Sequence, residues 1–410
     1  MKFRLGGVVS MLGALLFGSV QPVTASETAY IAVSSDVSFQ AMGEYDQSKL
    51  NQILSTDRQA FETIPTGLSF PQVGNAVSLY RVKYHTVVPE KNNRPVEVSG
   101  LIAVPKTKQA SFPMLSYQHG TVFSRTEVPS FLDQSMETQL MVAQFAGNGY
   151  VVIGADYIGK GISTEPDSYM VKESTAQATY DMLQASGKVL QHLGVKTDDL
   201  FLSGWSQGAW ATQVFRNRLE SLQVPVKAAA TASTPNDLYL LMTRWINNPT
   251  ALDVGWLVGT ASLLIGSYGE YYDMPGLSTV AVNPAYQKAQ DEFYSNKIGW
   301  EGASSVFPKK IADFFQPAFS QQSSLVANTF FRHLQENQAY QWRFSTPSRY
   351  YYGEVDEVVT PYIATLPEAY QNTINGAAVS VVFAGKKADH RGTFIFGILD
   401  QKKWFDSLRQ

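Results

Sequence analysis

Short apolar runs alternate with helical patterns along most of the chain. Residues 78–87 and 96–104 are β-rich runs separated by the turn-like segment 89–95, a pattern that predicts a hairpin. Apolar side chains at helical spacing over residues 136–145, and again over 209–219, predict two helices. Further strands are expected at residues 112–117, 150–154, 200–203, 226–232, 348–352 and 378–383.

A third helix is expected from Ser174 to Leu193. Ser174 and Gln177 have the spacing of a capping box, and Gly194 is a typical residue for ending a helix. Strands that alternate with helices over this much chain predict an α/β fold, with a mostly parallel sheet covered by helices on both faces.

The alternation stops between residues 237 and 342. This stretch is aromatic and has no βα repeat, which predicts a helical insertion over the sheet; a separate small domain is the alternative. The expected organisation is a signal peptide at 1–25, a first core part at 26–236, a helical cap at 237–342 and a second core part at 343–410.

The first residues have the pattern of a secretory signal. Lys2 and Arg4 precede the apolar run 5–20, and small residues lead to an expected cut after Ala25. The run is shorter than the roughly 20 residues of a transmembrane helix, so no stable membrane span is expected. We therefore expect a secreted or periplasmic protein.

Composition narrows the possible chemistry. The chain has 410 residues; its hydrophobic fraction of 44% is ordinary for a globular protein and its charged fraction of 16% is low, which excludes a disordered chain. Its net charge of −3 disfavours nucleic acid as a partner. The absence of cysteine excludes a disulfide framework, a thiolate metal site and a cysteine nucleophile. No metal-site or nucleotide-binding motif is visible, so no cofactor is expected.

The clearest catalytic motif is Gly-Trp-Ser-Gln-Gly at residues 204–208. This G-x-S-x-G sequence lies between an expected strand and an expected helix, the context in which a tight turn exposes a nucleophilic serine. The glycines permit close backbone approach, and the helix N-terminus stabilises developing negative charge. Ser206 is therefore the candidate nucleophile; an ordinary glycine-rich turn is the alternative.

A serine hydroxyl needs a base and an acid, which follow such a motif in the order acid, then histidine. Of the five histidines, His85, His119 and His192 precede Ser206, and His333 lies in the insertion. His390, in a loop after the last expected strand, is the candidate base.

The candidate acid follows the penultimate expected strand. Asp356 is the first choice, with Glu354 and Glu357 as alternatives in the same acidic loop. Its expected role is to orient the imidazole and stabilise its protonated form. Asp389 is adjacent to His390 in sequence, so its side chain is expected to point away from the imidazole.

An oxyanion hole needs two backbone N–H donors. The N–H of Gln207, directly after the nucleophile, is the first. The second is expected from the loop at residues 118–121, with Thr121 favoured and Gly120 or Val122 as alternatives. His119 is expected to be a structural residue of this loop.

Taken together, these residues resemble the α/β-hydrolase superfamily, specifically its secretory-lipase-like branch. The resemblance covers roughly residues 45–410, and the motifs that carry it are segments 99–105, 118–121, 156–163, 204–208, 234–238, 353–356 and 389–390. It implies a sheet of about eight strands under a helical cap. It also implies that Asp156, Tyr157, Gly159 and Gly161 shape the wall of the active-site cleft.

The activity implied by the resemblance is secreted hydrolysis of carboxylic esters, small-molecule or lipid, through a Ser206–His390–Asp356 triad and an acyl-enzyme. Esterase and lipase both remain open. Acyl transfer or peptide hydrolysis by the same triad is the alternative chemistry. A secreted binding protein of the same fold that has lost turnover is the alternative class.

Overall fold

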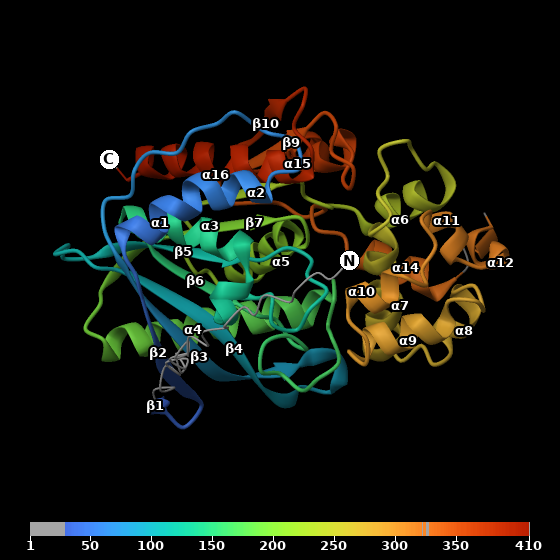
Figure 1. Cartoon of the computed structure of the whole chain (residues 1–410), viewed down its shortest axis with the longest axis horizontal. Helices are drawn as coiled ribbons and strands as arrows, with labels where there is room; N and C mark the ends of the chain where they lie inside the picture. The colour runs from blue at the N-terminus through green and yellow to red at the C-terminus, as the bar shows by residue number, and fades with distance from the viewer. Residues whose placement is uncertain (1–28, 322, 325–327, 410) are drawn as a thin grey trace, which may run out of the picture.

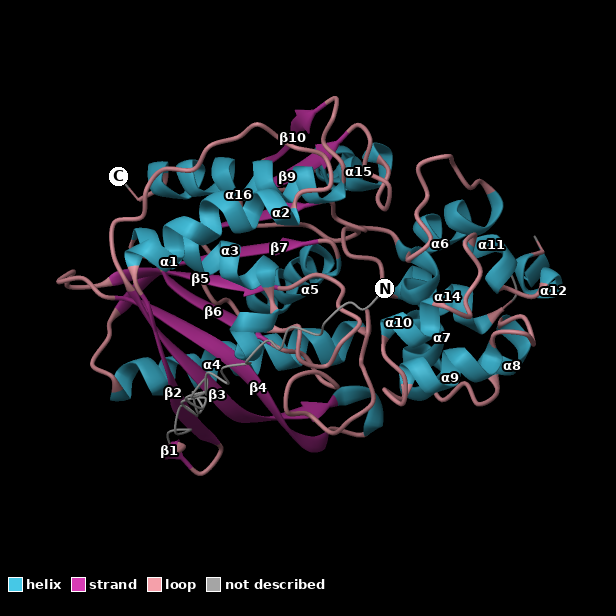
Figure 2. Cartoon of the chain, viewed as in Figure 1, coloured by secondary structure: helices cyan, strands magenta, loops and turns pink. Residues whose placement is uncertain are grey.

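The computed structural model describes residues 29–321, 323–324 and 328–409; the expected signal peptide lies outside the described residues and stays a prediction. Within these ranges the strands form one ten-stranded sheet in the order β1-β2-β3-β4-β6-β5-β7-β8-β9-β10, which Figure 2 shows as a twisted layer between helices. The strands are β1 Ile31–Ser34, β2 Val37–Tyr45, β3 Val77–Val88, β4 Arg94–Pro105, β5 Phe112–Gln118, β6 Val151–Ala155, β7 Thr197–Trp205, β8 Ala228–Ala232, β9 Ser348–Gly353 and β10 Val379–Gly385.

The sheet has a parallel part and an antiparallel part. Strands β5 to β10 pair in parallel, whereas β1 to β4 are antiparallel and join the rest through the β4–β6 pair. The predicted α/β fold with a mostly parallel sheet is confirmed. The expected number of about eight strands is wrong, because β1 and β2 extend the sheet beyond the predicted β3–β4 hairpin.

Helices cover both faces of the sheet. Met182 of α4 and Trp210 of α5 pack with Ile153 of β6 on one face. Leu140 of α3 and Phe394 of α16 pack with Leu115 of β5 on the other. The helices of this core are α1 Gln47–Gln52, α2 Arg58–Phe61, α3 Met136–Phe145, α4 Lys172–His192, α5 Gln207–Ser221, α15 Pro361–Ile374 and α16 His390–Ser407; a π-helical turn at Ile53–Asp57 joins α1 to α2.

The predicted capping box at Ser174 is wrong. Helix α4 begins at Lys172 with Val171 as its N-cap, so Ser174 lies inside the first turn. The Ser174 hydroxyl and backbone N–H both donate to the carboxylate of Glu90. A partner more than eighty positions away in the chain therefore replaces the local cap. The predicted end at Gly194 agrees with its φ of +70°.

Between β8 and β9 the described chain is helical. Figure 1 shows these helices gathered at one end of the molecule, beside the ends of the parallel strands. They are called the cap helices below: α6 Leu238–Asn247, α7 Leu257–Tyr271, α8 Leu277–Ala281, α9 Gln287–Tyr294, α10 Trp300–Ser304, α11 Ile311–Phe314, α12 Pro317–Ser320 and α14 Thr329–Glu336. The division of the chain into core and cap domains stays a prediction. No helix of the described ranges is both long enough and apolar enough for a membrane span.

Candidate active site

Ser206 occupies a strained turn between β7 and α5. Its φ of 57° and ψ of −123° are unusual for a residue other than glycine, and such strain is concentrated at functional sites. The turn fits only because its neighbours lack a Cβ. A Cβ on Gly204 would lie 2.1 Å from the Gly208 carbonyl oxygen, and one on Gly208 would lie 1.9 Å from that of Gln118. The serine is thereby held at the end of β7, directly beside the 118–121 loop.

Asp356 and His390 form a buried pair. The Nδ1 atom of His390 lies 3.0 Å from Oδ1 and 3.2 Å from Oδ2 of Asp356. The Oδ1 atom also accepts the backbone N–H groups of Val358 and Val359, each at 2.9 Å. These bonds fix the carboxylate, and the carboxylate favours the proton on Nδ1, which leaves Nε2 free to act as a base.

Burial and charge compete in setting the pKa values of this pair. Burial alone would lower the pKa of His390, but the negative charge and hydrogen bond of Asp356 outweigh burial and raise it. Burial alone would raise the pKa of Asp356, but the facing imidazole and the hydrogen bonds hold it below its ordinary value. The pair therefore favours an ionised carboxylate beside an imidazole that readily accepts a proton.

The structure places His390 differently from the expectation. The sequence predicts a loop residue here, but His390 is the first residue of α16, and Asp389 is the N-cap that accepts the N–H of Gly392 at 2.7 Å. This capping bond joins the Asp389 side chain to the backbone of α16, whereas the imidazole contacts Asp356. A Cβ on Gly353, at the end of β9, would lie 2.1 Å from the Ala388 carbonyl oxygen. Close backbone contact thus brings the Asp356 loop and the His390 helix together.

Ser206 and His390 line the same cavity of about 550 Å³, called the outer cavity below. Its lining includes Phe123, Trp256, Trp300, Glu357 and Arg391. Within the described residues no hydrogen bond joins the Ser206 hydroxyl to the imidazole, a contact that often forms only when substrate is bound. The volume lies within the range of small-molecule sites.

The candidate oxyanion donors lie beside Ser206. In the described part of the chain, the backbone N–H groups of Thr121 and Gln207 have no hydrogen-bond acceptor, and both residues line a pocket together with Ser206. The Gly120 N–H instead donates to Glu137 at 2.6 Å, which removes Gly120 as an alternative donor. Val122 lines the outer cavity only. The geometry therefore favours Thr121 and Gln207.

Glu137, on α3, has no counterpart in the sequence-based expectations. It is a buried carboxyl group that accepts hydrogen bonds from the Tyr117 hydroxyl and from the Gly120 N–H. Burial raises its pKa to about 7, although both hydrogen bonds oppose this shift. It is a positioning residue for the 118–121 loop rather than a lining residue of the cavity.

The other histidines near functional segments have structural contacts. His119 is buried, its ring nitrogens lie 2.8 Å from the Gly120 carbonyl oxygen and 3.2 Å from that of Asp156, and it stacks on Tyr157. Burial lowers its pKa to about 4. His333 stacks on Tyr272 and contacts Glu336 at 2.7 Å. Neither ring lines the outer cavity.

The Asp-Tyr-x-Gly-x-Gly segment supports the 118–121 loop. The Tyr157 hydroxyl donates to the His119 carbonyl oxygen at 3.1 Å, and Tyr157 itself has a φ of 69°. The Asp156 carboxylate accepts from Ser99 and from the Ser130 N–H. A Cβ on Gly161 would lie 2.2 Å from this carboxylate. The segment therefore acts behind the cleft wall, and its side chains brace the loop that carries Thr121.

Two residues hold the backbone of His390, and sequence reasoning gave neither of them this role. The Trp205 indole Nε1 donates to the His390 carbonyl oxygen at 3.1 Å, and Glu357 accepts the His390 N–H at 3.0 Å. Glu357 was an alternative acid; it binds the backbone of the base rather than its ring. Trp205 lies at a variable position of the elbow motif, so no sequence signal distinguishes it.

Within the described residues no cluster of three or more His, Asp or Glu side chains could hold a metal ion.

Comparison with known proteins shows the fold. No protein-family profile and no characterised sequence matches this chain. A candidate hydrolase from Legionella pneumophila superposes with a TM-score of 0.79 at 22% identity, over 91% of this chain and 97% of that one. The rice cell wall degrading esterase LipA from Xanthomonas oryzae gives 0.73 at 21% identity, over 90% and 95%. Candida antarctica lipase A gives 0.59 at 16% identity, over 77% and 73%. The chain therefore has the α/β-hydrolase fold, as the resemblance implied, and resembles esterases and lipases in structure.

Proposed function

We propose that the protein is a serine hydrolase of carboxylic esters that works through an acyl-enzyme. The observation that carries the proposal is the joint arrangement of a strained Ser206 and an Asp356-held His390 around one cavity. Fold neighbours that are esterases and lipases support the same reaction class.

In the proposed reaction the Ser206 oxygen attacks the ester carbonyl carbon while His390 Nε2 takes the serine proton. The carbonyl electron pair moves onto oxygen, where the N–H groups of Thr121 and Gln207 stabilise the oxyanion. His390 then gives the proton to the leaving alcohol oxygen as the carbon–oxygen bond breaks. In the second half, the water oxygen attacks the acyl carbon while His390 takes a proton from the water. His390 then returns the proton to the Ser206 oxygen as the acyl–serine bond breaks and the acid leaves.

The test is hydrolysis of nitrophenyl esters with acyl chains of two to sixteen carbons. Ser206→Ala should lower the rate by at least about 10⁴-fold with an unchanged circular dichroism spectrum, because only the nucleophile is lost. Ser221→Ala, at the exposed far end of α5, is the matched control and should retain activity. Equal rates in wild type and Ser206→Ala, or no hydrolysis by either, would contradict the proposal.

The proposed enzyme acts outside the cytoplasm. The basic, apolar and small-residue pattern of residues 1–25 supports export with removal of that segment. N-terminal sequencing of the exported protein should begin at Ser26; a protein retained in the cytoplasm with its first residues intact would contradict this.

A further inference from the structure

A second pocket meets the outer cavity at the nucleophile. This inner pocket lies between the core and the cap helices, and Ser206, Thr121 and Trp256 line both spaces. Because Trp256, the N-cap residue of α7, lines both spaces, its side chain lies at the boundary between them. The two spaces otherwise share no lining residue, and each contains a different part of the candidate machinery.

The position of the base assigns the two parts of an ester to the two spaces. His390 lines the outer cavity and does not line the inner pocket, whereas Gln207 lines the inner pocket alone. The leaving alcohol oxygen must receive its proton from His390, so the alcohol part lies in the outer cavity. The acyl carbon chain, attached to the carbon that Ser206 attacks, is then directed into the inner pocket.

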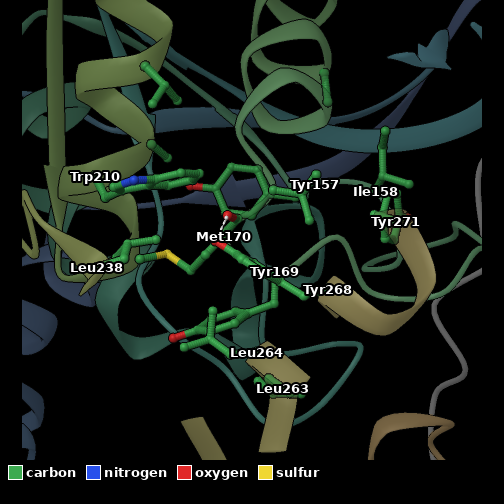
Figure 3. Packing of buried hydrophobic residues seen from close by; sticks show 14 of the residues in the cluster. Tyr157, Ile158, Tyr169, Met170, Trp210, Leu238, Leu263, Leu264, Tyr268 and Tyr271 are labelled. Carbon is green, nitrogen blue, oxygen red and sulfur yellow. Dashed lines mark hydrogen bonds between the residues drawn. The ribbon is translucent and has the colours of Figure 1, made fainter. Parts of the chain in front are cut away.

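The inner pocket is small. Its free space is about 20 Å³, roughly the room of one or two water molecules. Thr260 adds a polar group to the lining besides Thr121, Ser206 and Gln207, and the other lining side chains are apolar. Figure 3 shows four of the apolar ones, Tyr169, Met170, Leu238 and Leu264, brought together from three separate segments of the chain. Leu241, Met242 and Trp245 of α6 also line the pocket.

The outer cavity is far larger. Its volume of about 550 Å³ is typical of a site for a drug-sized ligand. Aromatic faces line it, with Phe123 stacked on Trp300 at a centroid distance of 4.5 Å, and Glu127, Glu357 and Arg391 add polar groups. Such a lining suits a bulky alcohol that has both an apolar face and polar groups.

We infer that the enzyme is selective for esters of a short acyl group, about two to four carbons, with a bulky alcohol. This inference rests on the proposed ester hydrolysis and adds its substrate class. A chain that outgrows the inner pocket must displace packed side chains, and each excess methylene in such a pocket lowers kcat/KM by about 10- to 200-fold.

Two isomeric esters test the inference directly. The compounds 2-phenylethyl acetate and methyl 3-phenylpropanoate have the same composition and both release a primary alcohol, but the bulky group lies on opposite sides of the ester. We expect kcat/KM to favour the acetate by at least about 100-fold in the wild type. Equal values, or a preference for the phenylpropanoate, with hydrolysis still dependent on Ser206 would overturn the inference alone. Absence of Ser206-dependent hydrolysis of either isomer would overturn the proposed function as well.

Neighbouring leucines of α7 provide a matched pair of variants. Leu264 lines the inner pocket and Leu263, also buried, does not. Leu264→Ala should raise the kcat/KM of nitrophenyl octanoate relative to nitrophenyl acetate by about 10-fold or more. Leu263→Ala should leave this ratio at the wild-type value. An equal shift in both variants, or no shift in Leu264→Ala, would contradict the assignment of the acyl group to the inner pocket.

Discussion

The indole of Trp205 donates a hydrogen bond to the backbone carbonyl oxygen of His390 at 3.1 Å, so the residue before the candidate nucleophile holds the residue that carries the candidate base. The indole also stacks on Phe394, one turn along α16 from His390. The elbow and the N-terminus of α16 are therefore one packed unit, which fixes the position of the imidazole relative to Ser206.

This relationship predicts a positioning role for Trp205. Trp205→Phe keeps an aromatic ring against Phe394 but removes the N–H donor, so kcat should fall by about 10-fold with a smaller change in KM. Trp404→Phe, on the far part of α16, controls for loss of an indole and should leave kcat unchanged. A change confined to KM, or an equal fall of kcat in both variants, would contradict this positioning role.

The His390–Asp356 pair predicts the pH dependence of catalysis. His390 must be neutral to accept the serine proton, so kcat/KM should fall as the pH drops through its pKa, which the pair raises above the ordinary value of about 6.5. In Asp356→Asn the charge is lost and burial dominates, so this acidic limb should move to lower pH. The kcat should also fall by roughly 10⁴-fold, because the imidazole loses its fixed tautomer. An acidic limb at the same pH in both proteins would show that another group controls the profile.

Glu137 predicts a pH dependence of stability. Its carboxyl group has a pKa of about 7 in the folded protein against 4.5 ordinarily, so between these values the folded state binds a proton that the unfolded state does not. Its contribution to stability is therefore lost as the pH rises from about 4.5 to 7.

Urea unfolding at pH 5 and pH 7.5 measures how far the free energy of unfolding falls between these pH values. The fall should be on the order of 2–3 kcal/mol larger for the wild type than for Glu137→Gln. The exposed Glu270→Gln is a matched control and should follow the wild type. The same pH dependence in Glu137→Gln as in the wild type would contradict the assignment.

Two glycines should respond differently to replacement by alanine, because an added Cβ would clash with the backbone at Gly208 but not at Gly187. Gly208→Ala places a Cβ 1.9 Å from the Gln118 carbonyl oxygen, so it should displace the 118–121 loop and abolish hydrolysis. Gly187 lies exposed within α4 with nothing within 4 Å of an added Cβ. Gly187→Ala should therefore raise the free energy of unfolding by up to about 1 kcal/mol and leave activity intact. An active Gly208→Ala enzyme would contradict the contact.

The parallel core and the candidate triad could be predicted from the sequence because their signals are local. The buried strands β5 to β8 have apolar runs, and the elbow motif at Ser206 directs attention to an acid and a histidine further along the chain. The strands β1 and β2 were missed because both are partly exposed and their apolar pattern is weak; β2 is placed by its pairing with β3, and β1 by its pairing with β2.

The features that escaped prediction depend on tertiary contacts. Glu90 replaces the local cap of Ser174, and Glu137 reaches Gly120 only because α3 packs behind the 118–121 loop. The separation into an inner pocket and an outer cavity likewise depends on how the cap helices pack over Ser206. No spacing in the sequence encodes such contacts.

Covalent labelling tests the central claim, that Ser206 is a nucleophile activated by His390. A nitrophenyl alkylphosphonate should react with the serine oxygen, release nitrophenolate and leave a stable adduct that mass spectrometry locates in the peptide containing Ser206. We expect one adduct in the wild type, none in Ser206→Ala and a rate lowered by at least about 10³-fold in His390→Gln. An adduct on another residue, or labelling that persists in Ser206→Ala, would contradict the account.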